Sequence, residues 1–263
     1  NLENGYYCFI PQPTLHKYLE HVKRINFEGS YYMRNQLDLD KRKTAERLSN
    51  LVNCDKDELA ITRNTTESLD LIISGFPWEK NDEAIFAMQD YGSMQEMFKL
   101  TAKRRGIVNK IISVPNHPVN DGEIVSLYER QITKKTKLIM VSHMINITGQ
   151  ILPVKKICEM AHSYNIDVLV DGAHCVGHID VDIKDLNCDY YGSSLHKWLS
   201  APLGTGLLFV KKDKISKIEP ILAGHIHERD SILRLNHIGT HPVHSDLAIN
   251  DAIDYLESIG IER

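Results

Sequence analysis

The feature that most constrains the fold is a series of short, continuously apolar runs separated by amphipathic stretches. Runs such as KLIMVS and DVLVD are apolar throughout their interiors instead of alternating with polar residues, which indicates strands covered on both faces. Strand and helix patterns follow each other in turn, so we predict an open α/β sheet with mostly parallel strands. The predicted strands are 59–62, 83–87, 109–114, 137–142, 167–170, 189–192 and 206–210. The predicted helices are 44–52, 67–75, 94–104, 124–132 and 154–163.

Length and composition limit the class of protein. The chain has 263 residues, 42% of them hydrophobic, which suits one large domain or two small ones. The net charge of −4 and the scattered basic residues argue against nucleic-acid binding, and no apolar run is long enough to cross a bilayer. The five cysteines are odd in number and lack CxxC spacing, which favours reduced thiols in a cytosol. We therefore expect a cytoplasmic protein, with export of a processed form left open because the chain begins at Asn1.

The segment 223–241 breaks the alternation. It is polar and rich in histidine, so we predict a long loop, followed by one amphipathic helix that starts near Ser245. The histidines are His225, His227, His237, His241 and His244. No carboxylate or cysteine completes a closed metal site with them, so we predict no metal and expect them to line the mouth of an active site.

Ligands of open α/β sheets bind outside the carboxyl ends of the strands, and Asp171 directly follows a buried strand. A desolvated carboxylate stays ionised only beside a cation or hydrogen-bond donors. A role for Asp171 as a helix cap, or as a paired aspartate in the core, explains its position equally well. A metal site with His174 and His178 fits no known ligand spacing.

Thr65 and Thr66 lie where a loop meets a helix. Free N–H groups and the helix dipole favour an anion there, although an ordinary Asn/Thr N-cap is the alternative. The sequence lacks GxxxxGK[ST] and a strand-following GxGxxG, which argues against nucleoside triphosphates and dinucleotides.

Lys197 precedes a turn and a continuously apolar strand. A lysine in a partly desolvated pocket has a lowered pKa and attacks aldehydes, whereas the alternative is an ordinary surface lysine. An amine, a buried carboxylate and an anion cradle at the strand ends are together what pyridoxal 5′-phosphate requires. We therefore predict that cofactor.

The chain resembles class V aminotransferase-fold enzymes, the group of cysteine desulfurases, selenocysteine lyases and isopenicillin N epimerase-like proteins. Five ordered segments carry the resemblance: NTTES, SHMINITGQILPV, VDGAHCVGHIDVDI, DYYGSSLHKWLSAPLGTGLLFV and HIGTHP. DYGSM, NTTESL and HIGTHP are closest to the epimerase-like branch. The resemblance implies fold type I, with a seven-stranded, mostly parallel sheet between helices. It also implies a cofactor-binding large domain over residues 1–235, and a loop and helix over 236–263 that lead into a small domain.

Site roles follow from the resemblance, position by position. It implies that Lys197 forms the internal aldimine and shuttles the Cα proton, and that Asp171 pairs with the pyridinium nitrogen. Asn146 and His174 are expected near the phenolic oxygen, and Tyr91 is favoured as the ring-stacking residue. The implied phosphate ligands are Thr65, Thr66, Ser194 and His196, with Thr240 reaching the phosphate of a neighbouring subunit. Shared sites of this kind imply a homodimer.

The reaction is left open among three fates of an amino-acid substrate. The resemblance favours an epimerase- or transaminase-like reaction through an external aldimine, with cysteine desulfurase or other C–S lyase activity second. The substrate-binding arginine and the persulfide-forming cysteine of the family are expected beyond Arg263, and Cys175 is a poor substitute because its position suits packing. A protein that binds the cofactor without efficient turnover is the third alternative.

Overall fold

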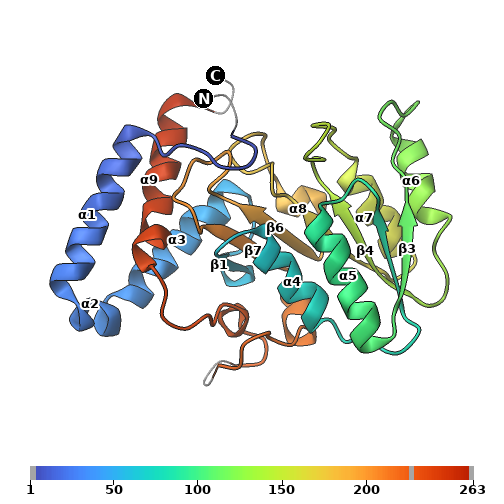
Figure 1. The fold of residues 1–263 in the computed structure, drawn as a ribbon, viewed down its shortest axis with the longest axis horizontal. Helices are drawn as coiled ribbons and strands as arrows, with labels where there is room; N and C mark the ends of the chain where they lie inside the picture. Colours follow the sequence, from blue (N-terminus) through green and yellow to red (C-terminus); the bar gives the residue numbers. More distant parts are fainter. Residues whose placement is uncertain (1–3, 225–227, 261–263) are drawn as a thin grey trace.

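The computed structural model describes residues 4–224 and 228–260 and is built around one seven-stranded sheet (Figure 1). The strand order is β1-β7-β6-β5-β4-β2-β3. The strands are β1 (Leu59–Thr62), β2 (Glu83–Ala87), β3 (Val108–Ile112), β4 (Thr136–Ser142), β5 (Asp167–Asp171), β6 (Tyr190–Ser194) and β7 (Gly206–Val210). All seven predicted strands are present. Only β7 runs against its neighbours, pairing antiparallel with both β1 and β6, so the predicted mostly parallel sheet is confirmed.

The boundary errors are largest for two strands, β6, predicted over 189–192 but spanning Tyr190–Ser194, and β3 at the sheet edge. The strand predicted over 109–114 spans Val108–Ile112 instead. Ile112 pairs with Ala87, the last residue of the only neighbouring strand, β2. The residues beyond Ile112 therefore have no strand to pair with, and Ser113 and Val114 instead form hydrogen bonds with the Gln89 side chain.

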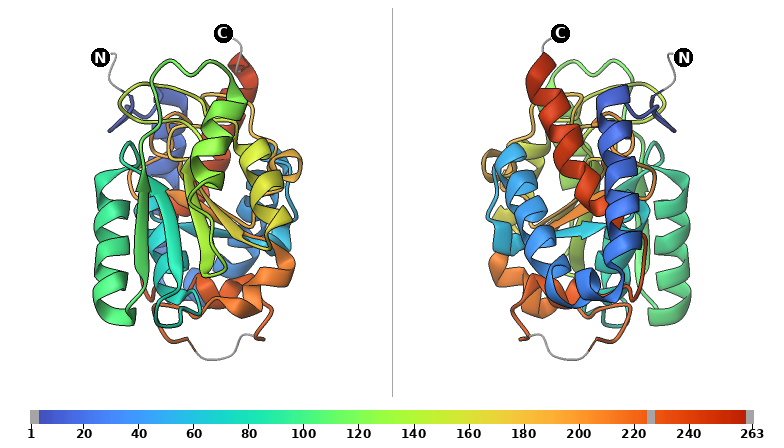
Figure 2. Two further views of the ribbon diagram at one scale, coloured as in Figure 1. Left: turned by 90° about the vertical axis from the view of Figure 1, so that its right-hand side faces the viewer. Right: turned by 90° about the vertical axis from the view of Figure 1, so that its left-hand side faces the viewer.

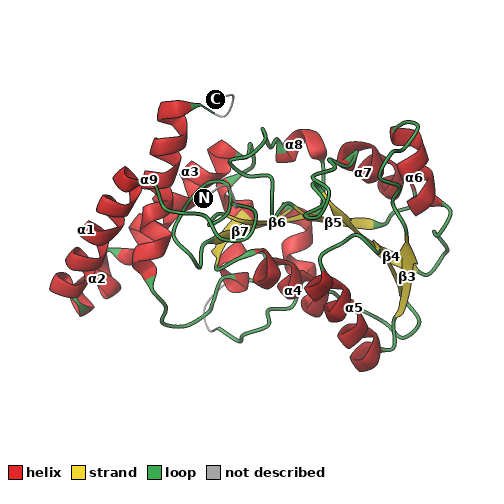
Figure 3. Ribbon diagram, turned by 45° about the horizontal axis from the view of Figure 1, so that its top comes forward, coloured by secondary structure: helices red, strands yellow, loops and turns green. Residues whose placement is uncertain are grey.

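Helices cover both faces of the sheet, as the continuous apolar runs predict (Figure 3). Along β4, Ile139 and Val141 belong to one buried cluster, while Leu138 and Met140 belong to another. The first cluster includes side chains of α3 (Leu37–Leu51), α6 (Asp121–Glu129), α7 (Val154–Ser163) and α8 (Ile183–Leu186). The second includes side chains of α4 (Thr65–Gly75) and α5 (Gly92–Arg105). Alternate residues of one strand thus pack against opposite layers of helices.

Three helices lie beside the sheet at one end of the molecule. α1 (Gln12–Glu28), α2 (Ser30–Asn35) and the first half of α3 are not among the predicted helices. Thr14 is the one fully buried residue of α1, and Leu15, Tyr18, Val22 and Ile25 recur at helical spacing and are half-buried. An apolar stripe therefore marks this helix, and the sequence-based prediction missed it. α1 lies along α9 (Val243–Ile259), although the two are far apart in the chain (Figures 1 and 2).

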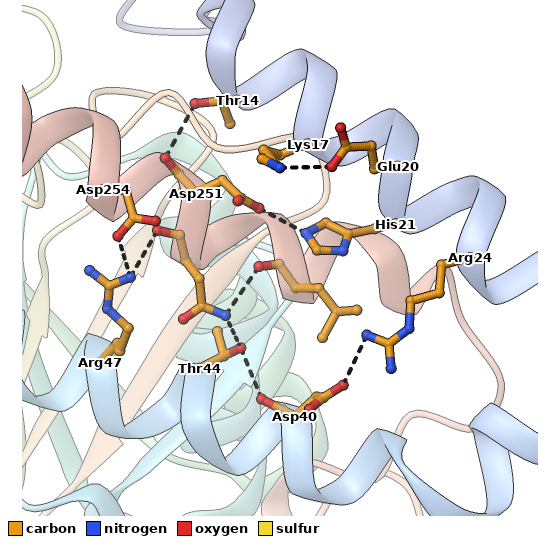
Figure 4. Close-up of polar contacts among 12 residues, drawn as sticks. Thr14, Lys17, Glu20, His21, Arg24, Asp40, Thr44, Arg47, Asp251 and Asp254 are labelled. Atoms are coloured by element: carbon orange, nitrogen blue, oxygen red, sulfur yellow. Dashed lines mark hydrogen bonds and ion pairs between the residues drawn. The ribbon is translucent and has the colours of Figure 1, made fainter.

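Polar contacts attach α9 to the N-terminal helices (Figure 4). The His21 ring nitrogen Nε2 lies 2.8 Å from Asp251 Oδ2, and the Asn250 amide donates to Thr44 Oγ1 at 2.7 Å. Arg47 pairs with Asp254 and Glu257. Apolar residues of α9 also join the larger core cluster; these are Ile249, Ala252, Ile253 and Leu256. The helix predicted to start near Ser245 is therefore confirmed, and it packs closely against the sheet-containing body.

The segment before α9 is less regular but not wholly a loop. A short 3₁₀ helix, η3 (Ile232–Leu235), buries Ile232 and Leu235, and the Arg234 guanidinium donates to the carbonyl of Ile218 at 2.7 Å. The polar composition of the segment conceals these two apolar anchors. His225 and His227 lie outside the described residues.

Candidate active site

One cavity of about 390 Å³ opens at the carboxyl ends of the parallel strands. The last residues of β4, β5 and β6 all line it: Ser142, Asp171 and Ser194. Three neighbouring parallel strands end at the same edge, so their terminal side chains converge, as expected for an open α/β sheet.

The cavity brings together nine of the ten predicted site residues. They are Thr65, Thr66, Tyr91, Asn146, Asp171, His174, Ser194, His196 and Lys197. Thr240 does not line the cavity and is exposed just before α9; its predicted ligand belongs to a neighbouring subunit. His237, His241 and His244 do not line the cavity either. His241 Nε2 instead lies 2.9 Å from Asp246 Oδ2, so this carboxylate holds the ring away from the predicted active-site mouth.

Lys197 lies in the connection between β6 and β7 and projects its amine into the cavity. Its Nζ lies 3.1 Å from His174 Nε2. Burial lowers the pKa of Lys197, and the nearby Asp171 charge only partly opposes that shift. An amine with a lowered pKa is more often unprotonated, which is the form that acts as a nucleophile or a base.

His174 is held on both sides of its ring. The Trp198 indole N–H donates to Nδ1 at 3.2 Å, while Lys197 lies beside Nε2. Burial lowers the pKa of His174 to about 4, with the nearby Lys197 and His178 charges acting in the same direction. His174 is therefore a neutral imidazole near pH 7.

Asp171 is 5% exposed, and its Oδ1 accepts the backbone N–H of Ala173 at 3.0 Å. Burial raises the pKa of Asp171, whereas the Ala173 hydrogen bond and the Lys197 charge oppose this. A buried carboxylate that faces a cavity with a raised pKa is ready to accept a cationic N–H group from a ligand.

The N-terminus of α4 forms a part of the cavity wall that is rich in hydrogen-bond donors, in contrast to the Asp171 carboxylate. Asn64 caps the helix, its side chain accepting the Glu67 N–H at 2.8 Å. Ser194 Oγ lies 2.9 Å from Thr65 N and 2.8 Å from Thr65 Oγ1. The close packing of β7 against the cap requires Gly206, since a Cβ atom there would lie 2.7 Å from Asn64 Cα. Hydroxyls and a helix N-terminus suit an anion such as a phosphate.

His196 adds a donor whose charge depends on the ligand. Its Nδ1 lies 3.1 Å from the Thr205 carbonyl oxygen, which can only accept a hydrogen bond, so Nδ1 carries a proton. Burial lowers the pKa of His196. His196 can therefore donate from Nε2 only as an imidazolium, a form that a bound anion stabilises.

Several cavity residues were not predicted from the sequence. Gly5, Tyr6 and Tyr7 come from the segment before α1 and form part of the wall. Cys8 attaches this segment to the Lys197 loop, its Sγ lying 3.0 Å from Ser200 Oγ. No pattern in the sequence marks this segment, because its place depends on tertiary contacts. The remaining additional lining residues are Asn64, Met94, Ser142, Met144 and Ala173. All five lie in the segments that carry the family resemblance, and only their individual roles were not predicted.

Other chemistries find less support in the part of the chain that the structure describes. Residues 4–224 and 228–260 contain no cluster of three metal-binding side chains, and no described helix is both long and apolar enough to span a membrane. Cys175 is buried, and burial raises the pKa of its thiol to about 12. A buried thiol of this kind is a packing residue and not a nucleophile.

Comparisons with known proteins agree with this site. The family model described as aminotransferase class-V matches residues 11–263. Isopenicillin N epimerase of Streptomyces clavuligerus is 30% identical over 231 residues, covering 82% of this chain and 58% of the relative. A probable cysteine desulfurase of Methanothermobacter thermautotrophicus is 26% identical over 266 residues, covering 96% of this chain and 65% of the relative. The chain thus spans less than two thirds of the length of these relatives.

The fold matches solved structures as well. A mutant of C-DES, with glycine covalently linked to its PLP cofactor, superposes with a TM-score of 0.88 at 22% identity, covering 98% of this chain and 71% of the other. This likeness confirms the predicted fold, type I of the PLP-dependent transferases with a mostly parallel seven-stranded sheet. From the family match over nearly its whole length, we conclude that the chain belongs to the aminotransferase class-V family.

Proposed function

We propose that this protein is a pyridoxal 5′-phosphate-dependent enzyme that acts on an amino acid. The observation that carries the proposal is one cavity in which a buried amine, Lys197, and a buried carboxylate, Asp171, meet the N-terminus of α4. Membership of a PLP-dependent family supports the cofactor, as does the PLP named in the C-DES structure.

The residues present fit this cofactor in size and in chemistry. The cavity volume of about 390 Å³ is in the range of small-ligand sites. Among the described residues Asp171 forms no ion pair, and although the Lys197 charge partly opposes it, burial keeps its pKa raised, which suits a protonated ring nitrogen. Thr65, Thr66 and Ser194 offer hydroxyl and helix-terminal donors, which suit a phosphate.

When bound, pyridoxal 5′-phosphate supplies an aldehyde that condenses with amines and a ring that withdraws electrons from the substrate Cα. Lys197 would hold the aldehyde and, once released from it, its Nζ would move the Cα proton. Asp171 would keep the ring nitrogen protonated, while Asn146 and His174 would contact the phenolic oxygen. Tyr91, which lines the cavity at the start of α5, would pack on the ring.

An epimerase- or transaminase-like reaction is the first candidate. The sequence motifs of the epimerase-like branch favour it. Isopenicillin N epimerase is one relative at 30% identity, although a probable cysteine desulfurase of Halalkalibacterium halodurans is also 30% identical, over 220 residues. C–S bond cleavage is the second candidate, because C-DES, described as a cystine C–S lyase, shares the fold. No cysteine of the described residues lines the cavity, and the persulfide-forming cysteine of the family is expected beyond Arg263.

We also propose that the protein functions as a homodimer. Apolar side chains are exposed on loops that carry cavity residues: Ile147 is 82% exposed beside Asn146, and Leu203 is 60% exposed after Lys197. Exposed apolar groups of this kind favour a partner surface. A second copy of the chain would also give Thr240 its predicted ligand.

Borohydride trapping tests the cofactor and its attachment together. Reduction of the purified protein, followed by peptide mass spectrometry, should find the cofactor fixed on Lys197. Lys197→Ala should lose both the fixation and the visible absorbance. Lys99→Ala, which removes an exposed lysine of α5, should keep them. Fixation on other lysines, or none on the wild type, would contradict the proposal.

Amino acids added to the unreduced protein then separate an enzyme from a protein that only binds the cofactor. A spectral change with a defined set of amino acids identifies the substrate class. Loss of the Cα deuterium label with inversion would indicate an epimerase, a keto acid a transaminase, and release of sulfide or persulfide a C–S lyase. Fixation on Lys197 without any spectral response would favour the binder.

A further inference from the structure

We propose that Trp198 is a positioning residue that fixes His174 in its Nε2–H tautomer, and that His174 thereby holds Lys197 as the uncharged amine. Trp198 lines no part of the cavity; it acts through His174. The inference deepens the proposed function and rests on it only for the identity of the aldehyde that the amine captures.

The hydrogen-bond inventory of the three side chains dictates the tautomer. An indole N–H can only donate, and Trp198 Nε1 lies 3.2 Å from His174 Nδ1. Nδ1 must therefore be the acceptor, which places the single proton of the neutral ring on Nε2. His174 Nε2 lies 3.1 Å from Lys197 Nζ, so its N–H points to the amine. An ammonium group has only donors and cannot accept this hydrogen bond, whereas a free amine has the lone pair to do so.

Packing holds Trp198 in the orientation that this requires. Its ring stacks on His178, with centroids 3.9 Å apart and planes 17° from parallel. The His178 Nδ1 lies 3.0 Å from the backbone carbonyl oxygen of His174, to which it donates. The loop also approaches the Trp198 backbone closely at Gly177 (φ +81°), where a Cβ would lie 2.7 Å from Leu199 Cα. Indole orientation is thus fixed by the same loop that carries His174.

The charged and titratable groups around the amine agree with this arrangement. Asp171 is the carboxylate that acts on Lys197 and favours its charged form, but burial outweighs it. The other titratable groups on the surrounding segments include His174, His178 and His196, and the phenols Tyr6, Tyr7 and Tyr91, which line the same cavity. His196 commits Nδ1–H to the Thr205 carbonyl, so it does not compete for the Lys197 contact through that nitrogen.

The uncharged form matters for capture of an aldehyde. The Nζ lone pair attacks the carbonyl carbon and forms the carbon–nitrogen bond. The two amine hydrogens and the carbonyl oxygen then leave as one water, so no oxidant or reductant is needed. An ammonium group has no lone pair and must first release its proton, which slows the reaction at neutral pH.

Trace acetylation measures the protonation of Lys197 without any catalytic assay. The cofactor-free full chain is labelled with acetic anhydride from pH 6 to 11, and mass spectrometry follows the peptide that contains Lys197. The wild-type midpoint should lie below that of an ordinary lysine, about 10.4. In Trp198→Phe the His174 ring can move its proton to Nδ1, so that Nε2 accepts a hydrogen bond from the Lys197 ammonium group. The midpoint should then rise by about one pH unit, a roughly tenfold smaller free-amine fraction near neutral pH.

Trp78→Phe is the matched control, because it removes the other indole of the chain. Trp78 donates to the Ile73 carbonyl at 2.8 Å and does not line the cavity, so its loss should leave the Lys197 midpoint unchanged. An unchanged midpoint in a folded Trp198→Phe protein would overturn the inference.

Nitrogen-15 NMR of the histidines tests the tautomer in the wild type, so the inference does not depend on the folding of a variant. His174 should show a protonated Nε2 and an unprotonated Nδ1; the reverse pattern, or an imidazolium, would overturn the idea. Neither readout requires bound cofactor. Failure of borohydride fixation would count against the proposed function alone, whereas an ordinary Lys197 titration would count against this inference alone.

Discussion

The two ends of strand β5 hold buried aspartates in opposite situations. Asp167, at its start, accepts hydrogen bonds from Lys214 Nζ at 2.8 Å, Lys217 Nζ at 2.6 Å and Tyr190 Oη at 2.9 Å. Asp171, at its end, accepts one from the Ala173 backbone and faces the cavity. Burial alone would raise both pKa values. The two lysines reverse this and lower the pKa of Asp167, whereas the pKa of Asp171 stays raised.

The difference teaches how to separate a structural carboxylate from a functional one. Both are continuous with the same apolar strand, and both are about 5% exposed. Only the partners distinguish them: Asp167 forms ion pairs with Lys214 and Lys217, while Asp171 forms no ion pair within the described residues, is influenced by Lys197 only through its charge, and lies where a ligand can supply a partner. Burying a carboxylate that has no ion-pair partner costs free energy. Such a carboxylate therefore points to a function, because a bound ligand can supply the partner.

Of the two aspartate substitutions, Asp171→Asn should give the larger change, and that change should be a loss of catalytic activity. An amide cannot keep a ring nitrogen protonated, so we expect turnover with the best amino-acid substrate to fall roughly 10²–10³-fold, as for loss of a strong electrostatic group. The free energy of unfolding of the cofactor-free protein should not fall, and should rise by about 1 kcal/mol, because a desolvated charge is removed. Steady-state kinetics and urea unfolding measure the two effects. A destabilised but fully active variant would break the comparison.

Asp167→Asn should show the reverse pattern. Removing one member of a buried ion pair leaves the other charge without its partner and costs about 3–5 kcal/mol. Lys214 and Lys217 keep 23% and 34% of their side-chain surface exposed, so we expect about 2–3 kcal/mol here. Urea unfolding measures the loss, and the catalytic parameters of the folded variant should stay within about twofold. Asp57→Asn, at an exposed position, is the control and should change neither.

The smallest effect is the pH dependence of these differences in stability. The pKa of Asp167 is lowered by folding, so its contribution is complete above the unfolded pKa, about 4, and is lost as the pH falls through the folded value. The gap between the wild type and Asp167→Asn should therefore narrow below about pH 4.

The pKa of Asp171 is raised by folding, so its cost in stability is absent below the unfolded pKa, about 4, grows between that pH and the folded pKa, and is constant above it. The Asp171→Asn protein should therefore be more stable to unfolding than the wild type only above about pH 4. Thermal unfolding of the three proteins between pH 3 and pH 7 measures both gaps. Parallel curves for the two variants would show that the aspartates do not differ in the proposed way.

Most of the sheet and much of the site follow from the sequence, for a clear physical reason. Strands covered on both faces must be apolar throughout, so β4 and β5 are marked by composition alone. Parallel strands end at one edge of a sheet, and Asp171 and Ser194 each follow a predicted strand, so the sequence is enough to place them together. Lys197 follows from its position after β6 and before the apolar run of β7.

What the sequence does not reveal depends on contacts between distant segments. α1 carries a short half-buried apolar stripe that includes Tyr18 and Val22, and its hydrogen bonds to α9 come from His21 and Thr14, which no periodicity marks. The wall formed by Gly5, Tyr6 and Tyr7 depends in turn on where α1 lies. Trp198 and His174 are close in space through the Gly177 loop, and no spacing rule indicates that an indole would choose the tautomer of this ring.

The packing of α1 on α9 sets an order of events during synthesis. About 215 residues separate the end of α1 from the start of α9, so at 5–20 residues per second a ribosome needs roughly 10–45 s to make the partner helix after the first one emerges. During that interval the sheet that carries Asp171 and Lys197 can already assemble, and Cys8 can already contact Ser200 beside the Lys197 loop. The contact between α1 and α9 is therefore the one that waits until α9 has left the exit tunnel.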